Sequence, residues 1–410
     1  MSEKSKKIPI PKSLTEGQYA TQEELLEVPR KQEDLYIGVP CENSYQENRI
    51  ALVPSSIRTL VGIGYRVLIE KGAGEKSNFT DKDLSEAGAE IVYSKEKVYE
   101  ANIIIKVSPP TLEEIDMMQP NQILISPLHI PLISAEYINK LKKKRVIALA
   151  MEYIQDASGS FPVVRILSEL AGVAAMLTAG ELMSITAGGK GSLLGGISGV
   201  PPAKVVILGA GMVAEYATRT ALGLGADVKI FDDNIYKLKR IQDQVGRQLF
   251  TSSINPVYLE KEILDADVVI GAIHSALART PVVVSEDMVM KMKPGAVIVD
   301  VSIDQGGCFA TSEITTLSHP TFVKHDVIHY CVPNMASKYP RTASIALSNI
   351  MAPLLLKAAE FGGMERLIAN HMGLRHGVYV YKGSLTNSYL GQRFKIKTTD
   401  LELLITTSAS

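Results

Sequence analysis

Short apolar runs alternate with amphipathic helical stretches along most of the chain, and this alternation predicts an α/β fold. In the first half, such runs lie at 35–39, 66–70, 103–107, 122–125 and 146–149. Helical patterns separate them, the clearest at 55–63 and 81–87. Strands that alternate with helices are typical of a mostly parallel, doubly wound sheet.

A second set of apolar runs follows residue 203, and two long helical patterns divide the sets. The second-half strands are predicted at 205–208, 228–231, 267–273 and 295–303. The long patterns, 164–186 and 341–361, are predicted to be helices that cross between two domains. The glycine-dense stretch 188–200 is either a loop near a cleft or a plain linker.

We therefore expect two doubly wound Rossmann-like domains, joined by long helices, with a cleft between them. Residues 1–34 are predicted to be a polar N-terminal extension. A substrate domain is expected at 35–165 together with 336–410, and a dinucleotide-binding domain at 166–335.

The second domain opens on a glycine motif that is typical of dinucleotide binding. Gly209, Gly211 and Ala214 match G-x-G-x-x-G/A between the strand 205–208 and a helix. Gly209 permits the tight turn, Gly211 lets a pyrophosphate approach the backbone, and Ala214 allows close helix packing. Asp232 ends the next strand, where it could accept hydrogen bonds from both ribose hydroxyls of NAD. The alternative is a Rossmann-like fold that binds no nucleotide.

Composition excludes several other classes of protein. The formal net charge is -1 over 410 residues, so no global field favours nucleic acid or an acidic membrane surface. The three cysteines have no metal-type spacing, and neither do the histidines of 319–329. We therefore expect no metal, no disulfide framework and a reducing compartment. With no signal peptide and no uninterrupted apolar run of about 18 residues, the protein is expected to be cytoplasmic.

Four residues are candidates for the chemistry of a nicotinamide enzyme, and each also has a structural interpretation. Arg49 could clamp a carboxylate, or be a surface arginine. Lys106 ends an apolar strand, where it could face a crevice or extend to solvent. His129 could transfer protons, or be a satisfied core histidine. Asp304 precedes Gly-Gly at the end of a strand, where it could act in a site or form a turn.

Motifs along nearly the whole chain resemble those of the alanine dehydrogenases, in the group that includes the soluble domain of proton-translocating transhydrogenase. These motifs are ENRIALVP, EKGAGEKSNF, GVPPAKVVILGAG, KPGAVIVDVSIDQGGCF, HPTF, YCVPNM and KGSLTN. IDQGGCF discriminates best, because it is the dehydrogenase form. The resemblance implies NAD-dependent oxidative deamination of L-alanine to pyruvate and ammonium by a homohexamer. Alternatives are a nucleotide-binding transhydrogenase subunit and a non-catalytic dinucleotide sensor.

The resemblance also implies a role for each matching residue. Arg49 and Lys106 are expected to bind the substrate carboxylate, His129 to be the acid/base, and Asp304 to position water or ammonia. The residues expected to line the cofactor site are Ser168, Gly209, Gly211, Ala214, Asp232, Lys237, Asn334 and Met335.

Three stretches depart from the usual family pattern. Val107–Pro110 stands where the family usually has Val-Lys-Glu-Pro, and His274–Arg279 where it has Val-Pro-Gly-Ala-Lys. Asn334–Lys338 replaces Asn-Met-Pro-Gly-Ala. These stretches flank the expected nicotinamide cleft, so they bear on which amino acid is preferred.

Overall fold

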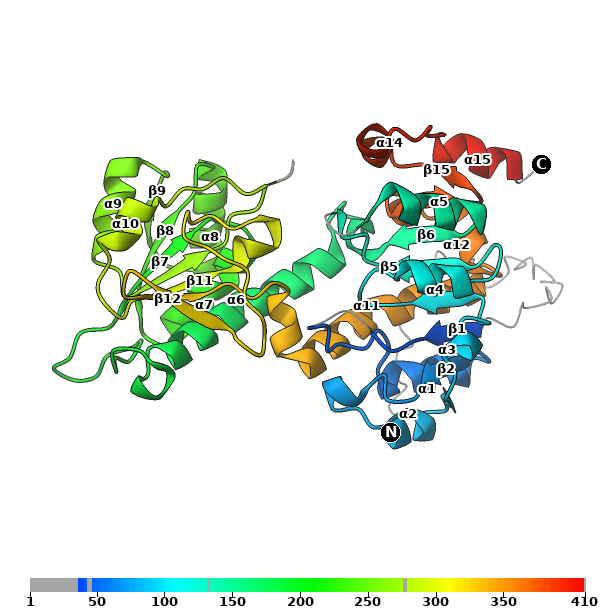
Figure 1. Ribbon diagram of the computed structural model, residues 1–410, viewed down its shortest axis with the longest axis horizontal. Helices are drawn as coiled ribbons and strands as arrows, with labels where there is room; N and C mark the ends of the chain where they lie inside the picture. The colour runs from blue at the N-terminus through cyan, green and yellow to red at the C-terminus, as the bar shows by residue number, and fades with distance from the viewer. Residues whose placement is uncertain (1–35, 43–45, 131–132, 276–278, 409–410) are drawn as a thin grey trace, which may run out of the picture.

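The protein is built of two α/β halves that are joined by two long helices (Figure 1). The computed structural model describes residues 36–42, 46–130, 133–275 and 279–408. Two mostly parallel sheets with interleaved helices confirm the predicted fold class. The expected N-terminal extension, residues 1–34, lies outside the described residues, and the predicted domain bounds stay a prediction.

The first half contains an eight-stranded sheet of order β15-β14-β6-β5-β4-β1-β2-β3. Its strands are β1 (Tyr36–Val39), β2 (Arg66–Glu70), β3 (Glu90–Val92), β4 (Ile103–Ile105), β5 (Ile123–Ser126), β6 (Ile147–Ala150), β14 (Val378–Tyr381) and β15 (Ser384–Leu385). Strands β1 to β6 pair in parallel, whereas β14 pairs antiparallel with β6. The C-terminal segment thus completes the first sheet, as the sequence predicts.

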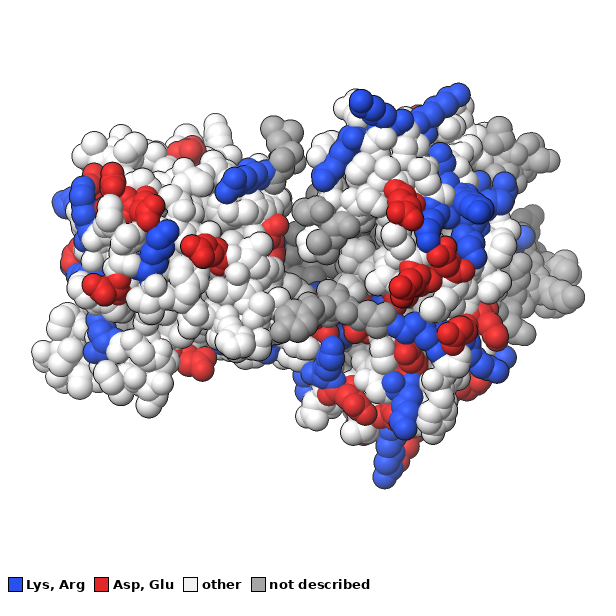
Figure 2. Space-filling model, viewed as in Figure 1, with Lys and Arg blue, Asp and Glu red and all other residues white. Residues whose placement is uncertain are grey.

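Helices cover both faces of this first sheet. They are α1 (Pro54–Gly62), α2 (Asp81–Glu86), α3 (Lys95–Val98), α4 (Leu112–Met117), α5 (Ala135–Lys143), α12 (Met364–Asn370), α13 (Met372–Arg375), α14 (Ser388–Phe394) and α15 (Leu401–Ser408). Lysines fill the last turn of α5, where they complement the negative end of the helix dipole. In Figure 2, lysine and arginine side chains gather over this part of the first half, and the surface is hollowed between the two halves.

The second half contains a seven-stranded sheet of order β12-β13-β11-β10-β7-β8-β9. Its elements are β7 (Lys204–Leu208), α7 (Met212–Gly223), β8 (Asp227–Phe231), α8 (Ile235–Val245), β9 (Phe250–Ser252), α9 (Pro256–Leu264), β10 (Val268–Gly271), α10 (Glu286–Met290), β11 (Val297–Asp300), β12 (Thr321–Lys324) and β13 (Val327–Tyr330). All neighbouring strands pair in parallel except β12 and β13, which form an antiparallel hairpin.

Helices α6 (Pro162–Leu182) and α11 (Pro340–Glu360) connect the halves, close to their predicted bounds. By length and composition alone, both are apolar enough to cross a membrane, although neither is an uninterrupted apolar run. Their apolar faces are used inside the protein. Ala174 and Ala179 of α6 belong to the core of the second half, and Leu347 of α11 to that of the first.

Several predicted strands are shorter than expected, and one of these differences affects the site. The strand predicted at 295–303 ends at Asp300, and residues Val301–Gln305 form the 3-10 turn η7 instead. The Asp300 carboxylate caps this turn by accepting a hydrogen bond from the Ser302 N–H at 3.0 Å, and Gly306 ends it at φ 93°. The turn matters for the site because Asp304 lies on it.

The contact between α6 and α7 predicts which glycine the fold requires. A Cβ on Gly172 would lie 2.3 Å from the Val213 carbonyl oxygen, so the two helices have no space for a side chain there. We expect Gly172→Ala to lower the free energy of unfolding by about 1–3 kcal/mol, because the helices must separate. Denaturant unfolding measures this loss.

Gly223→Ala is the matched control. Gly223 ends α7, and its Cβ would contact nothing within 4 Å. We expect this variant to be neutral or to gain up to about 1 kcal/mol from the better helix propensity of alanine. Equal losses in both variants would contradict the packing argument.

Candidate active site

The carboxyl ends of the strands carry the predicted catalytic residues, as is usual for ligand sites in α/β sheets. In the first half, Arg49 follows β1, Lys106 follows β4 and His129 follows β5. In the second half, Asp304 follows β11 on the turn η7. The site is therefore assembled from two separate sheets.

Two chain segments bind these halves together. The Asn48 N–H donates to the Ser337 hydroxyl at 3.0 Å, and that hydroxyl donates to the Gln46 carbonyl oxygen at 2.6 Å. The Leu317 N–H also donates to the Gln46 side-chain oxygen, at 2.9 Å. Ser337 lies in the 3-10 turn η8 (Met335–Lys338), so the loop after β1 is held against the segment that leads into α11.

Arg49 is a buried arginine with one dedicated partner, which excludes the interpretation as a surface residue. Its side chain is 7% exposed, and it donates from Nε and Nη2 to the two oxygens of Glu47, at 2.7 and 2.6 Å. Burial lowers the pKa of Arg49, but the Glu47 carboxylate outweighs it, so the pKa lies above its ordinary value. The guanidinium stays charged at the junction of the two halves.

Asp304 is an exposed carboxyl group near two first-half residues. Desolvation by the surrounding protein raises its pKa above the ordinary value, while the Asn334 N–H, His129 and Arg49 oppose this rise. The Asn334 N–H donates to Asp304 Oδ1 at 2.9 Å. The structure thus brings Asp304, Arg49 and His129 close enough for their charges to interact.

His129 is exposed, so it is not a core histidine. Its backbone lies in the left-handed region at φ 44°, which is uncommon for a residue other than glycine. The turn is held by Glu152, whose Oε1 accepts the N–H groups of Leu128 and His129 at 2.8 and 3.3 Å. Such strain, fixed by a half-buried carboxyl group, is typical of functional sites.

Lys106 is fully buried between two carboxylates. Its Nζ lies 3.1 Å from Glu42 and 3.4 Å from Glu114. Burial lowers its pKa and the two carboxylates raise it, with a net rise above the ordinary value. Glu42 also accepts a hydrogen bond from the hydroxyl of Ser108, at the position where the family usually has a lysine. The positive charge of Lys106 is therefore already balanced by carboxylates of the protein before a substrate binds.

The glycine motif forms the expected turn from β7 into α7. Gly209 has φ 109°, and a Cβ there would lie 2.4 Å from the Ala272 carbonyl oxygen. Gly211 caps α7 with no side-chain hydrogen bond, and a Cβ on it would meet nothing within 4 Å. Ala214 is fully buried. The backbone at Gly211 therefore borders open space, as the close approach of a pyrophosphate requires.

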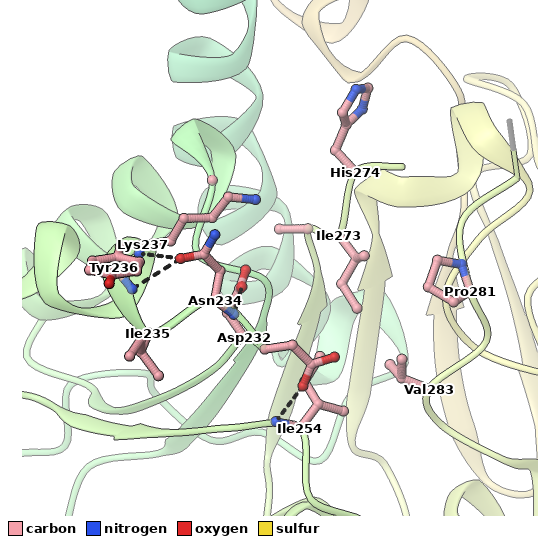
Figure 3. Close-up of a pocket in the computed structure, with 13 residues that line it drawn as sticks. Asp232, Asn234, Ile235, Tyr236, Lys237, Ile254, Ile273, His274, Pro281 and Val283 are labelled. Carbon is pink, nitrogen blue, oxygen red and sulfur yellow. Dashed lines mark hydrogen bonds between the residues drawn. The ribbon is translucent and has the colours of Figure 1, made fainter. Parts of the chain in front are cut away.

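A pocket of about 530 Å³ lies beside this turn (Figure 3). Gly211, Asp232 and Lys237 line it together, and Lys237 and His274 lie on opposite walls. The Asp232 carboxylate accepts the N–H groups of Ala210 and Asn234, each at 2.7 Å. Each carboxylate oxygen has a second lone pair, so Asp232 can still accept hydrogen bonds from ribose hydroxyls.

The other three residues expected at the cofactor lie outside this pocket. Ser168 is on α6, and Asn334 and Met335 are at the start of η8, beside Asp304. In the same segment, Lys338 Nζ donates to the Thr178 hydroxyl of α6 at 2.9 Å. This departure from the family pattern thus ties η8 to α6.

Two further candidates have structural surroundings. Cys308 is fully buried, and burial raises the pKa of its thiol well above the ordinary value, which disfavours a nucleophile. The histidines of 319–329 diverge, since His319 is exposed, His325 contacts Glu286 and His329 is buried against Phe322. In the described ranges, no group of three or more His, Cys, Asp or Glu side chains is placed to hold a metal ion.

Glu47 and Glu152 are site residues that the sequence analysis did not identify. Glu47 is two positions from Arg49, and a carboxylate so close to a candidate arginine was an available signal. Glu152 follows β6, the neighbour of the strand that leads to His129. Its position after a predicted strand was the only signal, because its partners are more than twenty residues away.

Comparisons with known proteins match nearly the whole described chain. The family model "Alanine dehydrogenase/PNT, N-terminal domain" matches residues 38–173, and "Alanine dehydrogenase/PNT, C-terminal domain" matches 175–388. The chain is 40% identical over 368 residues to alanine dehydrogenase 2 of Staphylococcus aureus (strain USA300), covering 89% of this chain and 98% of that protein.

Solved structures agree with these matches. An L-alanine dehydrogenase superposes with a TM-score of 0.82 at 37% identity, covering 88% of this chain and 99% of that one. A transhydrogenase from Sinorhizobium meliloti gives 0.74 at 23% identity, with 86% and 99% covered, and shares the fold alone.

The two motif glycines predict opposite outcomes on substitution by alanine. Gly209→Ala forces a side chain into a left-handed backbone against the Ala272 carbonyl, so we expect a loss of roughly 1–3 kcal/mol in unfolding free energy. Gly211→Ala leaves folding unchanged, but its methyl group enters the pyrophosphate path. We expect it to weaken NADH binding by about tenfold or more.

Thermal unfolding and a titration of NADH fluorescence measure these two effects separately. Native NADH affinity in the Gly211→Ala protein would show that the pyrophosphate lies elsewhere.

Proposed function

We propose, from the premise that this chain belongs to the alanine dehydrogenase/PNT family, that it catalyses the reversible, NAD-dependent oxidative deamination of L-alanine to pyruvate and ammonium. The observation that carries the proposal is the grouping of Arg49, His129 and Asp304 where the two halves meet. The dinucleotide turn of the second half begins one strand away from Asp304, because β10 alone separates β7 from β11.

The residues of the second half fit NAD. The open face at Gly211 suits the pyrophosphate, and Asp232 suits the adenosine ribose. A 2′-phosphate would be repelled by Asp232, which favours NAD over NADP. We assign Lys237 to the same pocket and Ser168, Asn334 and Met335 to the nicotinamide side. Bound NAD supplies a hydride acceptor, and the chain supplies binding, orientation and proton transfer.

We assign Arg49 to the substrate carboxylate. Glu47 uses the Nε edge of the guanidinium, so the edge formed by Nη1 and the second N–H of Nη2 is available for a two-bond contact. Lys106 is assigned a supporting role, because Glu42 and Glu114 already neutralise it.

The remaining steps are proton transfers, which we assign to His129. The substrate ammonium group must lose a proton before hydride leaves the α-carbon to give an iminium ion. Water then adds to the iminium carbon and loses a proton, and the resulting carbinolamine loses ammonia to leave pyruvate. Histidine exchanges protons near neutral pH, so an exposed His129 can serve each step. The Asp304 carboxylate, close to His129 and Arg49, stabilises the iminium charge and orients the water.

Two coarser properties complete the proposal. We propose a homohexamer, as the family resemblance implies, and a cytoplasmic location, as the three isolated cysteines without metal-type spacing suggest. A transhydrogenase role has less support, because that relation shows a shared fold alone.

The function is tested by following NADH absorbance after the protein is mixed with NAD and L-alanine. We expect NADH to accumulate with alanine, more slowly with other amino acids, and more slowly still when NADP replaces NAD. NADH formation that is absent with alanine but present with another amino acid would contradict the substrate assignment.

Substrate affinity is predicted to depend on Arg49. Charge-assisted hydrogen bonds contribute roughly 1.5–3 kcal/mol each, so Arg49→Ala should raise KM for alanine or pyruvate by about ten- to a hundred-fold. NADH affinity should stay within about twofold of the native value, because the pocket at Asp232 is untouched. Steady-state kinetics give both constants.

The control is Arg58→Ala, which removes an exposed arginine of α1. It should leave KM unchanged. An Arg49→Ala protein with native KM would mean that the substrate carboxylate binds elsewhere.

Turnover is predicted to depend on His129 and Asp304. His129→Ala should lower kcat by on the order of 10²–10⁴, the usual contribution of a general acid–base. Asp304→Asn keeps the shape and removes the charge, so kcat should fall while NADH still binds. Single-turnover hydride transfer is the measurement, and the exposed His319→Ala is the control. Near-native turnover without His129 would disprove its assignment.

A further inference from the structure

The Glu47 carboxylate is the meeting point of the two halves of the site. It is 3% exposed and receives four hydrogen bonds. Three come from Arg49, whose backbone N–H, Nε and Nη2 donate at 3.0, 2.7 and 2.6 Å. The fourth comes from the second half, where Asn334 Nδ2 donates to Oε2 at 2.9 Å. All four donors are matched by the lone pairs of one carboxylate.

The same asparagine also contacts Asp304. The backbone N–H of Asn334 donates to Asp304 Oδ1 at 2.9 Å, so its side chain binds one carboxylate and its main chain binds the other. Asn334 adopts φ 56° and ψ 52°, a left-handed conformation that asparagine tolerates better than most residues. A continuous chain of contacts thus runs from Arg49 through Glu47 and Asn334 to Asp304.

The surroundings hold this chain of contacts in place. The hydrogen bonds of Ser337 to Asn48 and Gln46 lie on either side of Glu47 in the sequence. Ser337 is 1% exposed, so these bonds are shielded from water. The contact between Glu47 and Asn334 is therefore part of a built junction between the halves.

We propose that Glu47 is a positioning residue that fixes the guanidinium of Arg49 relative to Asp304 through Asn334. This inference rests on the proposed function, because it assumes that Arg49 binds the substrate carboxylate and Asp304 acts at the reacting carbon. Glu47 aligns one edge of the guanidinium and leaves the other edge to the substrate. Through its contact with Asn334, the same carboxylate holds Arg49 at a fixed position relative to the second half, which carries the cofactor.

Glu47→Gln tests the proposal with little change in shape. An amide nitrogen at Oε2 would face the donor Arg49 Nη2, so that bond is lost, and Asn334 keeps its contact only when its own amide turns to accept. We expect kcat/KM for alanine to fall by about ten- to a hundred-fold. The loss should appear mainly in kcat, because Arg49 keeps its charge and still attracts the substrate. NADH affinity should stay within about twofold.

A double-mutant cycle tests the path through Asn334. Asn334→Ala removes the side-chain contact with Glu47 and keeps the backbone bond to Asp304. If Glu47 acts through Asn334, kcat of the double variant at saturating NAD, which removes any contribution of Asn334 to cofactor affinity, should lie within about threefold of that of Glu47→Gln alone. Effects that multiply would overturn the path, and a Glu47→Gln protein with kcat/KM within twofold of native would overturn the proposal.

Ser337→Ala is the matched control for a merely structural role. It weakens the same junction without a contact to Arg49 or to the Glu47 side chain. We expect a lower Tm and a kcat/KM within about threefold of native. An equal loss of kcat in Ser337→Ala and Glu47→Gln would mean that the junction, rather than Glu47, sets the activity.

Two further measurements keep the proposal decidable. The first measurement applies if Glu47→Gln does not fold. Glu47→Asp keeps the charge but cannot reach Asn334. A several-fold loss of kcat supports the proposal, and native kcat overturns it.

The second measurement is hydrogen exchange of residues 331–339, which needs no turnover. Exchange should be faster in the Glu47 variant than in the native protein, whereas unchanged exchange overturns the link between Glu47 and Asn334. A native protein that does not oxidise alanine would contradict the proposed function alone, since exchange still reports on Glu47.

Discussion

The pairing of residues 46–48 with residues 334–337 is the contact on which the site depends. Each sheet presents its own strand ends, but neither sheet holds both a substrate anchor and a dinucleotide turn. Bonds from Ser337 to Asn48 and Gln46, and from Asn334 to Glu47, bring the two edges together. Helices α6 and α11 are the covalent links between the halves. The polar contacts act close to the site itself, and they determine how Arg49 and Asp304 face each other.

Burial gives these charges their effect. Arg49, Glu47 and Lys106 are each less than a tenth exposed, so water screens them little. Buried charges are costly unless they are paired, and each of these is paired: Arg49 with Glu47, and Lys106 with Glu42 and Glu114. Asp304 differs from these residues, because desolvation raises its pKa and only the Asn334 N–H, His129 and Arg49 oppose the rise. A carboxylate in that position is well suited to stabilise a positive charge that develops beside it.

Strongly periodic and fully buried elements were predictable from the sequence. The strand 66–70 has the predicted bounds, because an apolar run must be buried. The strand β13 was missed, since His329 interrupts its apolar run. The η7 turn was predicted to be strand, because the cap from Asp300 is a side-chain contact.

The site residues Arg49, His129 and Asp304 were identified as candidates from the sequence, but only the structure shows that they lie close together. The link from Glu47 to Asn334 spans 287 residues, which no local pattern reveals.

The central claim is that the two halves form one site in which hydride passes from the α-carbon of alanine to NAD. The most direct test uses L-alanine deuterated at that carbon, with mass spectrometry of the cofactor after a single turnover. The account predicts that the reduced cofactor carries the deuterium and that pyruvate and ammonium form in equal amount. Reduced cofactor without deuterium, or no reduction while NADH binds normally, would contradict it.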